Sequence, residues 1–185
     1  MSSAYQNAIG AEVPVKLNAA GAVPVAVAGT GYSAQINITR PANVIAYTAG
    51  DVCGEALAAI TFPNTGPANG SIIITDADLR VDVAAIPAGM TSFRLHLYNA
   101  TPPSALADNA VWDLPAGDRA AYLGYIDIGA PLDVGSTLYV QTDGLPPRVY
   151  RMGASTSLFG YLVTNSAFTP SSATVKTVRI NAVGA

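Results

Sequence analysis

The sequence predicts an all-β protein, an antiparallel β-sandwich that is jelly-roll-like. Apolar residues alternate with polar ones along several short segments, as they do on strands with one buried face. Clusters of Gly, Pro, Asn and Asp separate these segments at near-regular spacing, which is typical of sandwiches. No segment of the central region carries apolar residues at sustained helical spacing.

Residues 71–128 form the centre of this prediction, with strands expected at 71–75, 79–83, 91–98 and 121–128. In the third of these, Phe93, Leu95 and Leu97 fall on the face opposite Arg94, His96 and Tyr98. The first face should lie in a core and the second in water. In the fourth, Leu123, Tyr125 and Asp127 oppose Tyr122, Gly124, Ile126 and Ile128.

Further strands are expected on both sides of this centre. They cover 33–39, 44–48, 55–62, 137–142, 157–164 and 175–182. The segment 55–62 is the ambiguous one, because its alanines and leucine also suit a helical turn; the flanking Gly54 and Pro63 favour a strand. About nine or ten strands at this spacing indicate a sandwich or jelly roll.

Residues 1–31 differ from the rest and are predicted to form an extended N-terminal arm or an edge hairpin, with the sandwich domain at 32–185. Two apolar pieces, each with a proline inside, carry the valines Val13, Val15, Val23 and Val25. Proline has no N–H, so these pieces suit an edge strand or an arm lying on a neighbouring subunit. The four valines are therefore candidate partner-binding residues.

Composition favours a component of an assembly over a free monomer. Only 11% of the residues are charged, against about a quarter in an average protein. A weakly charged surface is tolerable where partners cover it. The net charge of −3 argues against direct nucleic-acid binding. No apolar run approaches the ~20 residues that span a bilayer, and no signal peptide is visible.

The candidate chemistry is sparse, and we expect no enzyme, no cofactor and no metal. His96 is the single histidine and lacks any nucleophile signature, so we expect a solvent-side or interface role. Cys53 is single and is expected to be a partly buried small apolar residue. Asp76, Asp78 and Asp82 suit a surface charge ladder around Arg80 better than an incomplete calcium loop.

Three loop residues are further candidates for partner binding. Trp112 lies in a loop flanked by prolines and suits either an interface hot spot or a plug that closes one end of the sandwich. Arg148 and Arg151 follow a Pro-Pro pair, where they either pair with acids of a neighbouring subunit or remain solvated.

Several stretches, taken in order, resemble small virion proteins of tailed bacteriophages, in particular capsid decoration or cement proteins. These stretches are 46–52, 70–74, 93–99, 101–103, 107–112, 122–126 and 157–163. The resemblance covers roughly residues 33–182 and leaves out the N-terminal thirty. It consists of strands and turns without a catalytic signature, so it assigns a role to no individual residue.

This resemblance implies a homodimer or homotrimer on the exterior of the phage head, assembled in the host cytoplasm. Such a protein binds the major capsid protein and bridges neighbouring subunits against internal pressure. Another virion module of the tail, baseplate or fibre is the first alternative. A carbohydrate-binding sandwich, with Trp112 and the tyrosines as stacking platforms, is the second.

Overall fold

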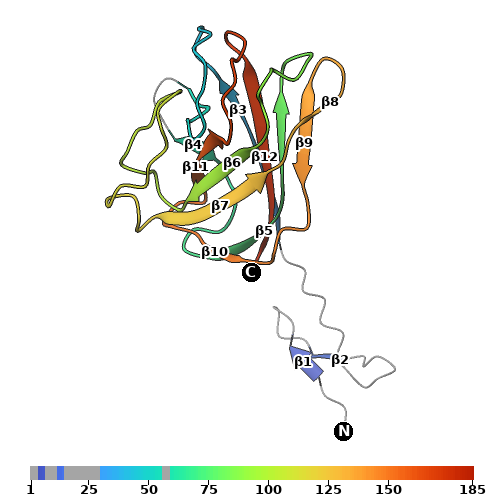
Figure 1. Ribbon diagram of the computed structural model, residues 1–185. Helices are drawn as coiled ribbons and strands as arrows, with labels where there is room; N and C mark the ends of the chain where they lie inside the picture. The colour runs from blue at the N-terminus through green and yellow to red at the C-terminus, as the bar shows by residue number, and fades with distance from the viewer. Residues whose placement is uncertain (1–3, 7–11, 15–29, 56–58) are drawn as a thin grey trace.

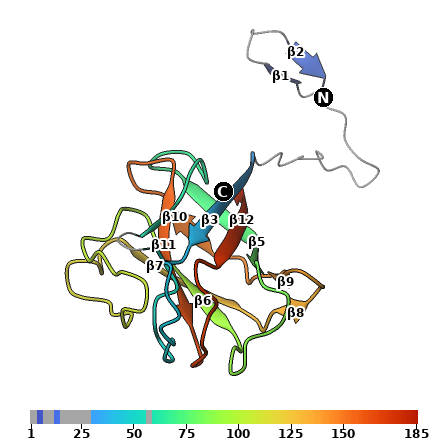
Figure 2. The ribbon, with the colours of Figure 1, turned by 90° about the horizontal axis from the view of Figure 1, so that it is seen from above.

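A computed structural model describes residues 4–6, 12–14, 30–55 and 59–185 of the chain. Two facing sheets make up the body of the molecule (Figure 1; Figure 2). The large sheet contains β3 (Gly31–Thr39), β12 (Val175–Gly184), β5 (Ser71–Val81), β9 (Leu138–Thr142), β8 (Leu132–Asp133) and β10 (Val149–Arg151). The small sheet contains β4 (Ile60–Phe62), β11 (Leu158–Thr164), β6 (Phe93–Tyr98) and β7 (Tyr122–Ile128).

The strand order is that of a jelly roll. Large-sheet neighbours run β3-β12-β5-β9-β8, with β10 beside β5, and small-sheet neighbours run β4-β11-β6-β7. Apart from the β6–β7 and β8–β9 hairpins and the short β10, successive strands cross from one sheet to the other. Every pair is antiparallel, and the described residues contain no helix. The predicted fold class is confirmed, and its jelly-roll connection with it.

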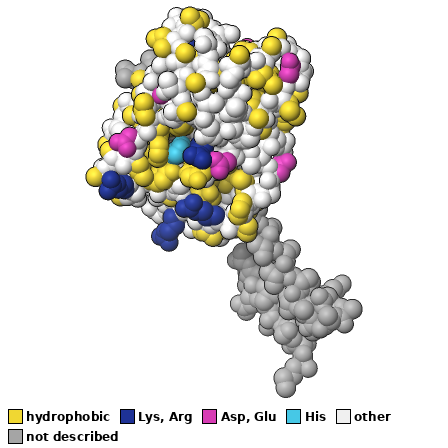
Figure 3. All heavy atoms as spheres, viewed as in Figure 1, with side chains coloured by type: hydrophobic (Ala, Val, Ile, Leu, Met, Phe, Trp, Pro, Cys, Tyr) yellow, Lys and Arg dark blue, Asp and Glu magenta, His cyan; other side chains and the backbone are white. Residues whose placement is uncertain are grey.

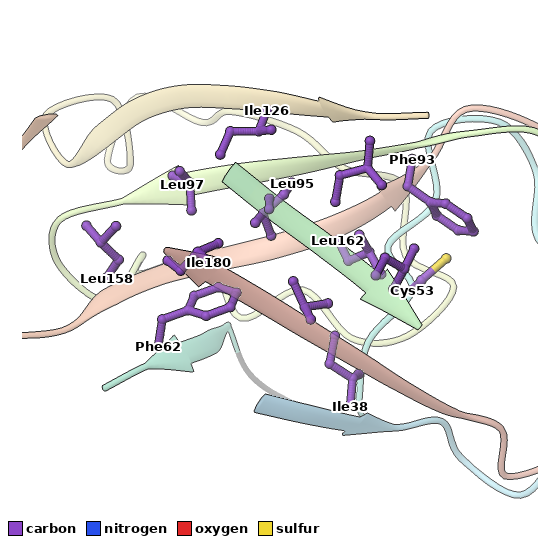
Figure 4. Packing of buried hydrophobic residues seen from close by; sticks show 14 of the residues in the cluster. Ile38, Cys53, Phe62, Phe93, Leu95, Leu97, Ile126, Leu158, Leu162 and Ile180 are labelled. Carbon is purple, nitrogen blue, oxygen red and sulfur yellow. The ribbon is translucent and has the colours of Figure 1, made fainter. Parts of the chain in front are cut away.

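The core lies between the sheets and uses the alternation expected from sequence. From the small sheet, Phe93, Leu95 and Leu97 are fully buried, as are Leu158 and Leu162. The large sheet contributes a matching set from its own inner face: Ile38, Ile72, Ile74, Leu79, Val178 and Ile180. Figure 4 shows side chains of the two sets packed against each other.

A β-bulge joins two predicted strands into one. The segments 71–75 and 79–83 were expected to be separate, but β5 runs without a break from Ser71 to Val81. Its pairing with β12 slips at Thr75, so Asp76 lies opposite Asn181 and Ile74 opposite Ala182. One inserted residue reverses the side-chain phase, and both halves of the strand can then bury their apolar residues.

A second bulge corrects the predicted faces of β7. Gly124 pairs with Leu97 while Tyr122 pairs with Tyr98, so Leu123 is the extra residue. Leu123 therefore packs on the main core and Tyr122 on the outer face, so the predicted grouping of Leu123 with Tyr125 and of Tyr122 with Ile126 was wrong. Ile126 and Ile128 share one face, as predicted, and both are buried.

The segment 44–48 is not a strand; only Tyr47 makes a bridge, with Phe168. At the N-terminus, β1 (Ala4–Gln6) pairs with β2 (Glu12–Pro14). The hairpin expected from the sequence joined the two valine-proline pieces to each other, so the observed hairpin begins earlier in the chain. Val13 lies in β2, whereas Val15, Val23 and Val25 lie outside the described residues. The division of the chain after residue 31 stays a prediction.

Candidate interaction surfaces

An aromatic cluster covers the outer face of the small sheet. Trp112, from the loop between β6 and β7, stacks on His96 of β6 with ring centroids 3.8 Å apart. His96 Nδ1 lies 3.0 Å from the Tyr122 hydroxyl, and Tyr98 packs beneath against Tyr161. His96 and Tyr98 are buried, so the prediction that this face is wet was wrong for two of its three residues. The alternation along β6 could not predict that residues of the β6–β7 loop cover this face.

The environment of His96 favours packing over catalysis. Burial lowers the pKa of His96 to about 4, with a further contribution from the nearby Arg94 cation. The imidazole is therefore neutral near pH 7. Its ring neighbours are Trp112, Tyr122 and Tyr125. Among the described residues its Nδ1 is hydrogen-bonded to the Tyr122 phenol and to no serine, threonine or cysteine.

Trp112 does not close an end of the sandwich, because it lies on the outer face of the small sheet and belongs to a cluster apart from the main core. It also lines an open hollow of about 330 Å³ with Arg94, His96 and Asn165. Its role in a partner interface stays a prediction. Figure 3 shows apolar side chains around the histidine on this face.

A second hollow, of about 450 Å³, lies beside β7. Its walls are Tyr125 to Asp127 on one side and the segment 142–150 on the other. Arg94 pairs with Asp127 at 2.9 Å and lies over the Tyr125 ring, whereas Arg148 lies over Tyr150. We refer to this hollow as the β7 groove.

The two predicted arginines lie at the same end of the molecule and are exposed. Arg148 contacts the Tyr150 ring from 5.1 Å, and the carbonyl of Arg151 accepts a hydrogen bond from Asn99 Nδ2 at 3.1 Å. Neither guanidinium forms an ion pair within the described part of the chain. Pairing with acids of another subunit stays a prediction for both.

A group of exposed aliphatic residues marks the opposite end of the molecule. The loops 40–55, 82–92, 129–137 and 165–174 gather there, because Thr39, Val81, Leu138 and Val175 lie at one end of the large sheet. Large apolar side chains on these loops are exposed by 45 to 70%: Val44, Ile45, Ile86, Leu132 and Val134. We call this the apolar end. Figure 1 shows its loops together at the top, away from the C-terminus, and Figure 3 shows yellow side chains there.

The exposed charges of the apolar end are all acidic. Glu55, Asp82 and Asp133 are exposed on its described loops, while Arg40, the one cation of these loops, is buried. Arg148 precedes β10 and Arg151 ends it, and β10 pairs with the start of β5, at the opposite end of the large sheet. Arg119 lies in the β6–β7 loop, and Arg94, which is also exposed, lies near the start of β6 and pairs with Asp127. The apolar end was not predicted from the sequence. The signal that could have indicated it is the presence of single aliphatic residues among turn-forming residues in these loops.

The predicted surface charge ladder is present only in part: Arg80 pairs with Asp78, and within the described residues no ion pair joins it to Asp82. Asp78 is fully buried on the outer side of β5, where Arg179 Nη2 lies 2.5 Å and Arg80 Nε 3.6 Å from its carboxylate. Asp76 accepts instead from Asn181 at 2.6 Å. Arg80 and Arg179 flank the buried Asp78, which indicates a structural role for this carboxylate.

A buried polar network ties the long β6–β7 loop to the start of the sandwich. The Arg40 Nε donates to the Tyr47 hydroxyl at 2.9 Å and lies 3.3 Å from Asp108, which also accepts from Tyr47 at 2.5 Å. Cys53 is fully buried beside this network, more so than expected, and burial raises the pKa of its thiol to about 12. Burial likewise lowers the pKa of the Lys176 ammonium.

Within the described residues, no three side chains of His, Cys, Asp or Glu come together as metal ligands would. The described residues also include no helix with the length and apolar character to cross a membrane.

Comparison with known proteins yields distant likenesses. No protein-family model matches the chain, and no curated protein does. A chain of an Israeli acute paralysis virus particle aligns with 14% identity and a TM-score of 0.27, covering 94% of this chain and 84% of that one. A chain of the Kashmir bee virus virion aligns with 14% identity and a TM-score of 0.28, covering 98% and 88%. Both are virion chains.

Proposed function

We propose that this chain is a virion structural protein, and specifically a decoration protein that binds the outer surface of a phage head and bridges neighbouring major capsid subunits. The sequence resemblance to phage cement proteins suggests this role, and the jelly roll is an architecture that virion proteins share with lectins and cupins. Since one fold serves many functions, the function has to be inferred from the surfaces of the molecule.

The observation that carries the proposal is the apolar end. Five large aliphatic side chains are exposed on neighbouring loops, in a protein with only 11% charged residues. Fully burying one such side chain is worth about 1.5–3 kcal/mol, so covering part of five contributes several kcal/mol to an interface. Exposed aliphatic residues gathered in this way mark a binding surface.

The same end indicates the chemistry of the partner surface. Its exposed charges are Glu55, Asp82 and Asp133, so a complementary partner is apolar with a basic rim. A shell of repeated subunits presents the same surface many times. Many modest contacts of this kind resist the separation of capsomers because all must break together.

The test is to purify particles from the organism that encodes the chain and to quantify the chain by mass spectrometry against the major shell protein. The proposal predicts a fixed ratio of the two proteins through successive density gradients. A chain that stays in the soluble fraction contradicts it. Immunolabelling of the particles then distinguishes the head from the tail, baseplate or fibre, which is the alternative location.

A further inference from the structure

We propose that the β7 groove binds a neutral glycan. An exposed tyrosine, two carboxylates and a guanidinium surround this groove, and contacts within the chain hold each of them in place. The isolated chain would bind the glycan without any virion, so the site stands or falls independently of the proposed function.

The β7 groove has the size and the composition of a ligand site. Its volume of about 450 Å³ lies within the range of about 300–1,000 Å³ that small-molecule sites occupy. Such sites combine apolar wall with a few polar groups that fix the orientation of the ligand. Here the apolar wall comes from Ile126, Leu145 and Pro146, and the polar groups from Asp127, Thr142, Asp143 and Arg148.

The groove suits a compact ligand better than an added peptide strand. β9 approaches the edge of β7, and Thr142 Oγ1 donates a hydrogen bond to the Asp127 carbonyl at 3.3 Å. A strand added to β7 would need this main-chain acceptor for itself. A ligand in the groove is therefore recognised mainly by side chains.

Tyr125 offers a platform for a sugar ring. It lines the groove on the outer side of β7 and is 46% exposed, although the Arg94 guanidinium lies 4.8 Å from the centre of its ring. The face of an aromatic ring is weakly negative, so it attracts C–H groups such as those on the flat side of a pyranose. Figure 3 shows this face of the molecule, with basic and acidic side chains next to the histidine and its apolar surroundings.

Arg148 supplies hydrogen-bond donors that are already positioned. Its guanidinium lies 5.1 Å from the centre of the Tyr150 ring and close to Gly124 of β7. A Cβ at Gly124 would come within 2.6 Å of Nη1, so the glycine makes room for the guanidinium. Within the described residues this cation forms no ion pair. Its planar set of N–H groups can therefore donate to neighbouring hydroxyls of a ligand.

Two carboxylates supply the matching acceptors. Asp127 accepts from Arg94 Nε at 2.9 Å, and Asp143 accepts from Gln141 Nε2 at 2.6 Å. These bonds orient the carboxylates, and each carboxylate has two oxygens that can accept further hydrogen bonds. Hydroxyls both donate and accept, so the many hydroxyls of a sugar complement acids and a guanidinium around one hollow.

The charge of the groove selects a neutral ligand. Asp127 is paired with Arg94, and Asp143 and Arg148 contribute one charge of each sign. The groove therefore carries no net charge, whereas a site for phosphate or another polyanion gathers several cations. A glycan without acidic groups fits this balance and the Tyr125 platform, and lectins are among the proteins that use a jelly roll.

The experiment incubates the full-length chain with an array of neutral, sialylated, sulfated and phosphorylated glycans, and titrates the bound glycans by calorimetry. The groove variants are Tyr125→Ala and Arg148→Ala. Arg151→Ala is the matched control, because Arg151 is also exposed at this end of the molecule but does not line the groove. Melting curves followed by circular dichroism show that each variant is folded.

We expect neutral glycans to bind, and each groove variant to lower the affinity at least about tenfold because it removes a principal contact. Arg151→Ala should bind like the parent chain. Three results overturn the inference: no neutral glycan binds, only acidic glycans bind, or Arg148→Ala and Arg151→Ala have equal effects. Because no virion is present, such a result leaves the test of the proposed function untouched.

Discussion

Arg40 and Lys176 are two of nine basic residues in the chain, and both are buried. Arg40 is compensated by Asp108, by Tyr47 and by the carbonyls of Asn43 and Ile45. Lys176 has no hydrogen-bond partner for its Nζ within the described residues and lies over the Tyr47 ring at 5.6 Å. Residue-level stability therefore depends on a polar network that sequence alternation does not reveal.

Replacing Asp108 with alanine should be strongly destabilising, because it leaves the Arg40 guanidinium buried without a counter-charge. Removing one partner of a buried ion pair costs about 3–5 kcal/mol. Urea unfolding followed by fluorescence measures the change. Asp143→Ala is the control, since Asp143 is an exposed carboxylate on a loop, and its effect should be small. Equal effects of the two substitutions would contradict the role given to the network.

His96 should make the protein less stable in mild acid. Its pKa is lowered from 6.5 to about 4 in the folded protein, so the unfolded chain takes up a proton first as the pH falls. The contribution of the neutral His96 to the free energy of unfolding is fully present above pH 6.5 and declines as the pH drops towards 4. At 1.4 kcal/mol per pH unit, the loss reaches about 3 kcal/mol.

Urea titrations at pH 7.5 and at pH 4.5 measure this decline. The variant His96→Gln cannot ionise and should lose less stability between the two pH values than the parent chain. An unchanged pH dependence in His96→Gln would assign the effect to other groups.

Among the elements, the sequence predicted strands where one face alternates simply and failed where a bulge shifts the phase. Phe93, Leu95 and Leu97 could be assigned to the core because β6 contains no irregularity. The phase change at Thr75 depends on how β5 pairs with β12, and the one at Leu123 on how β7 pairs with β6. Both partner strands are distant in sequence. Local patterns hold no information on such pairing.

The candidate surfaces were predictable only in part, for the same reason. Trp112 was identified as a candidate, but not its stacking on His96, because the loop returns over the sheet only in three dimensions. The apolar end is assembled from separate loops whose contributions, such as Ile86 and Leu132, are unremarkable one at a time.

The bulge in β7 predicts a sensitive glycine. Gly124 has a φ of +106°, and a Cβ there would lie 2.6 Å from Arg148 Nη1. Gly124→Ala should therefore reduce the free energy of unfolding by about 1–3 kcal/mol, the usual range for such backbone strain. Gly117→Ala is the matched control, because a Cβ at Gly117 meets nothing within 4 Å. Thermal unfolding of both variants measures the difference, and equal melting temperatures would contradict the strain.

At the scale of the whole molecule, the two ends of the jelly roll differ in chemistry. One end exposes aliphatic side chains and carboxylates, and the other exposes Arg148 and Arg151. The proposed function assigns shell binding to the aliphatic end.

The central claim is that the apolar end attaches the chain to a virion shell. The most direct measurement compares the amounts of Val134→Glu and Val149→Glu variants that co-sediment with purified particles lacking the native chain. The two valines are exposed by 62% and 58%, so both substitutions should leave the fold intact. They lie at opposite ends, because Val149 pairs with Ile73 near the start of β5, whereas Val134 follows β8 beside the other end of that strand. The account predicts that Val134→Glu lowers binding at least about tenfold, as loss of 1.4 kcal/mol does, while Val149→Glu binds like the parent chain. Equal binding by both variants, or loss confined to Val149→Glu, would contradict it.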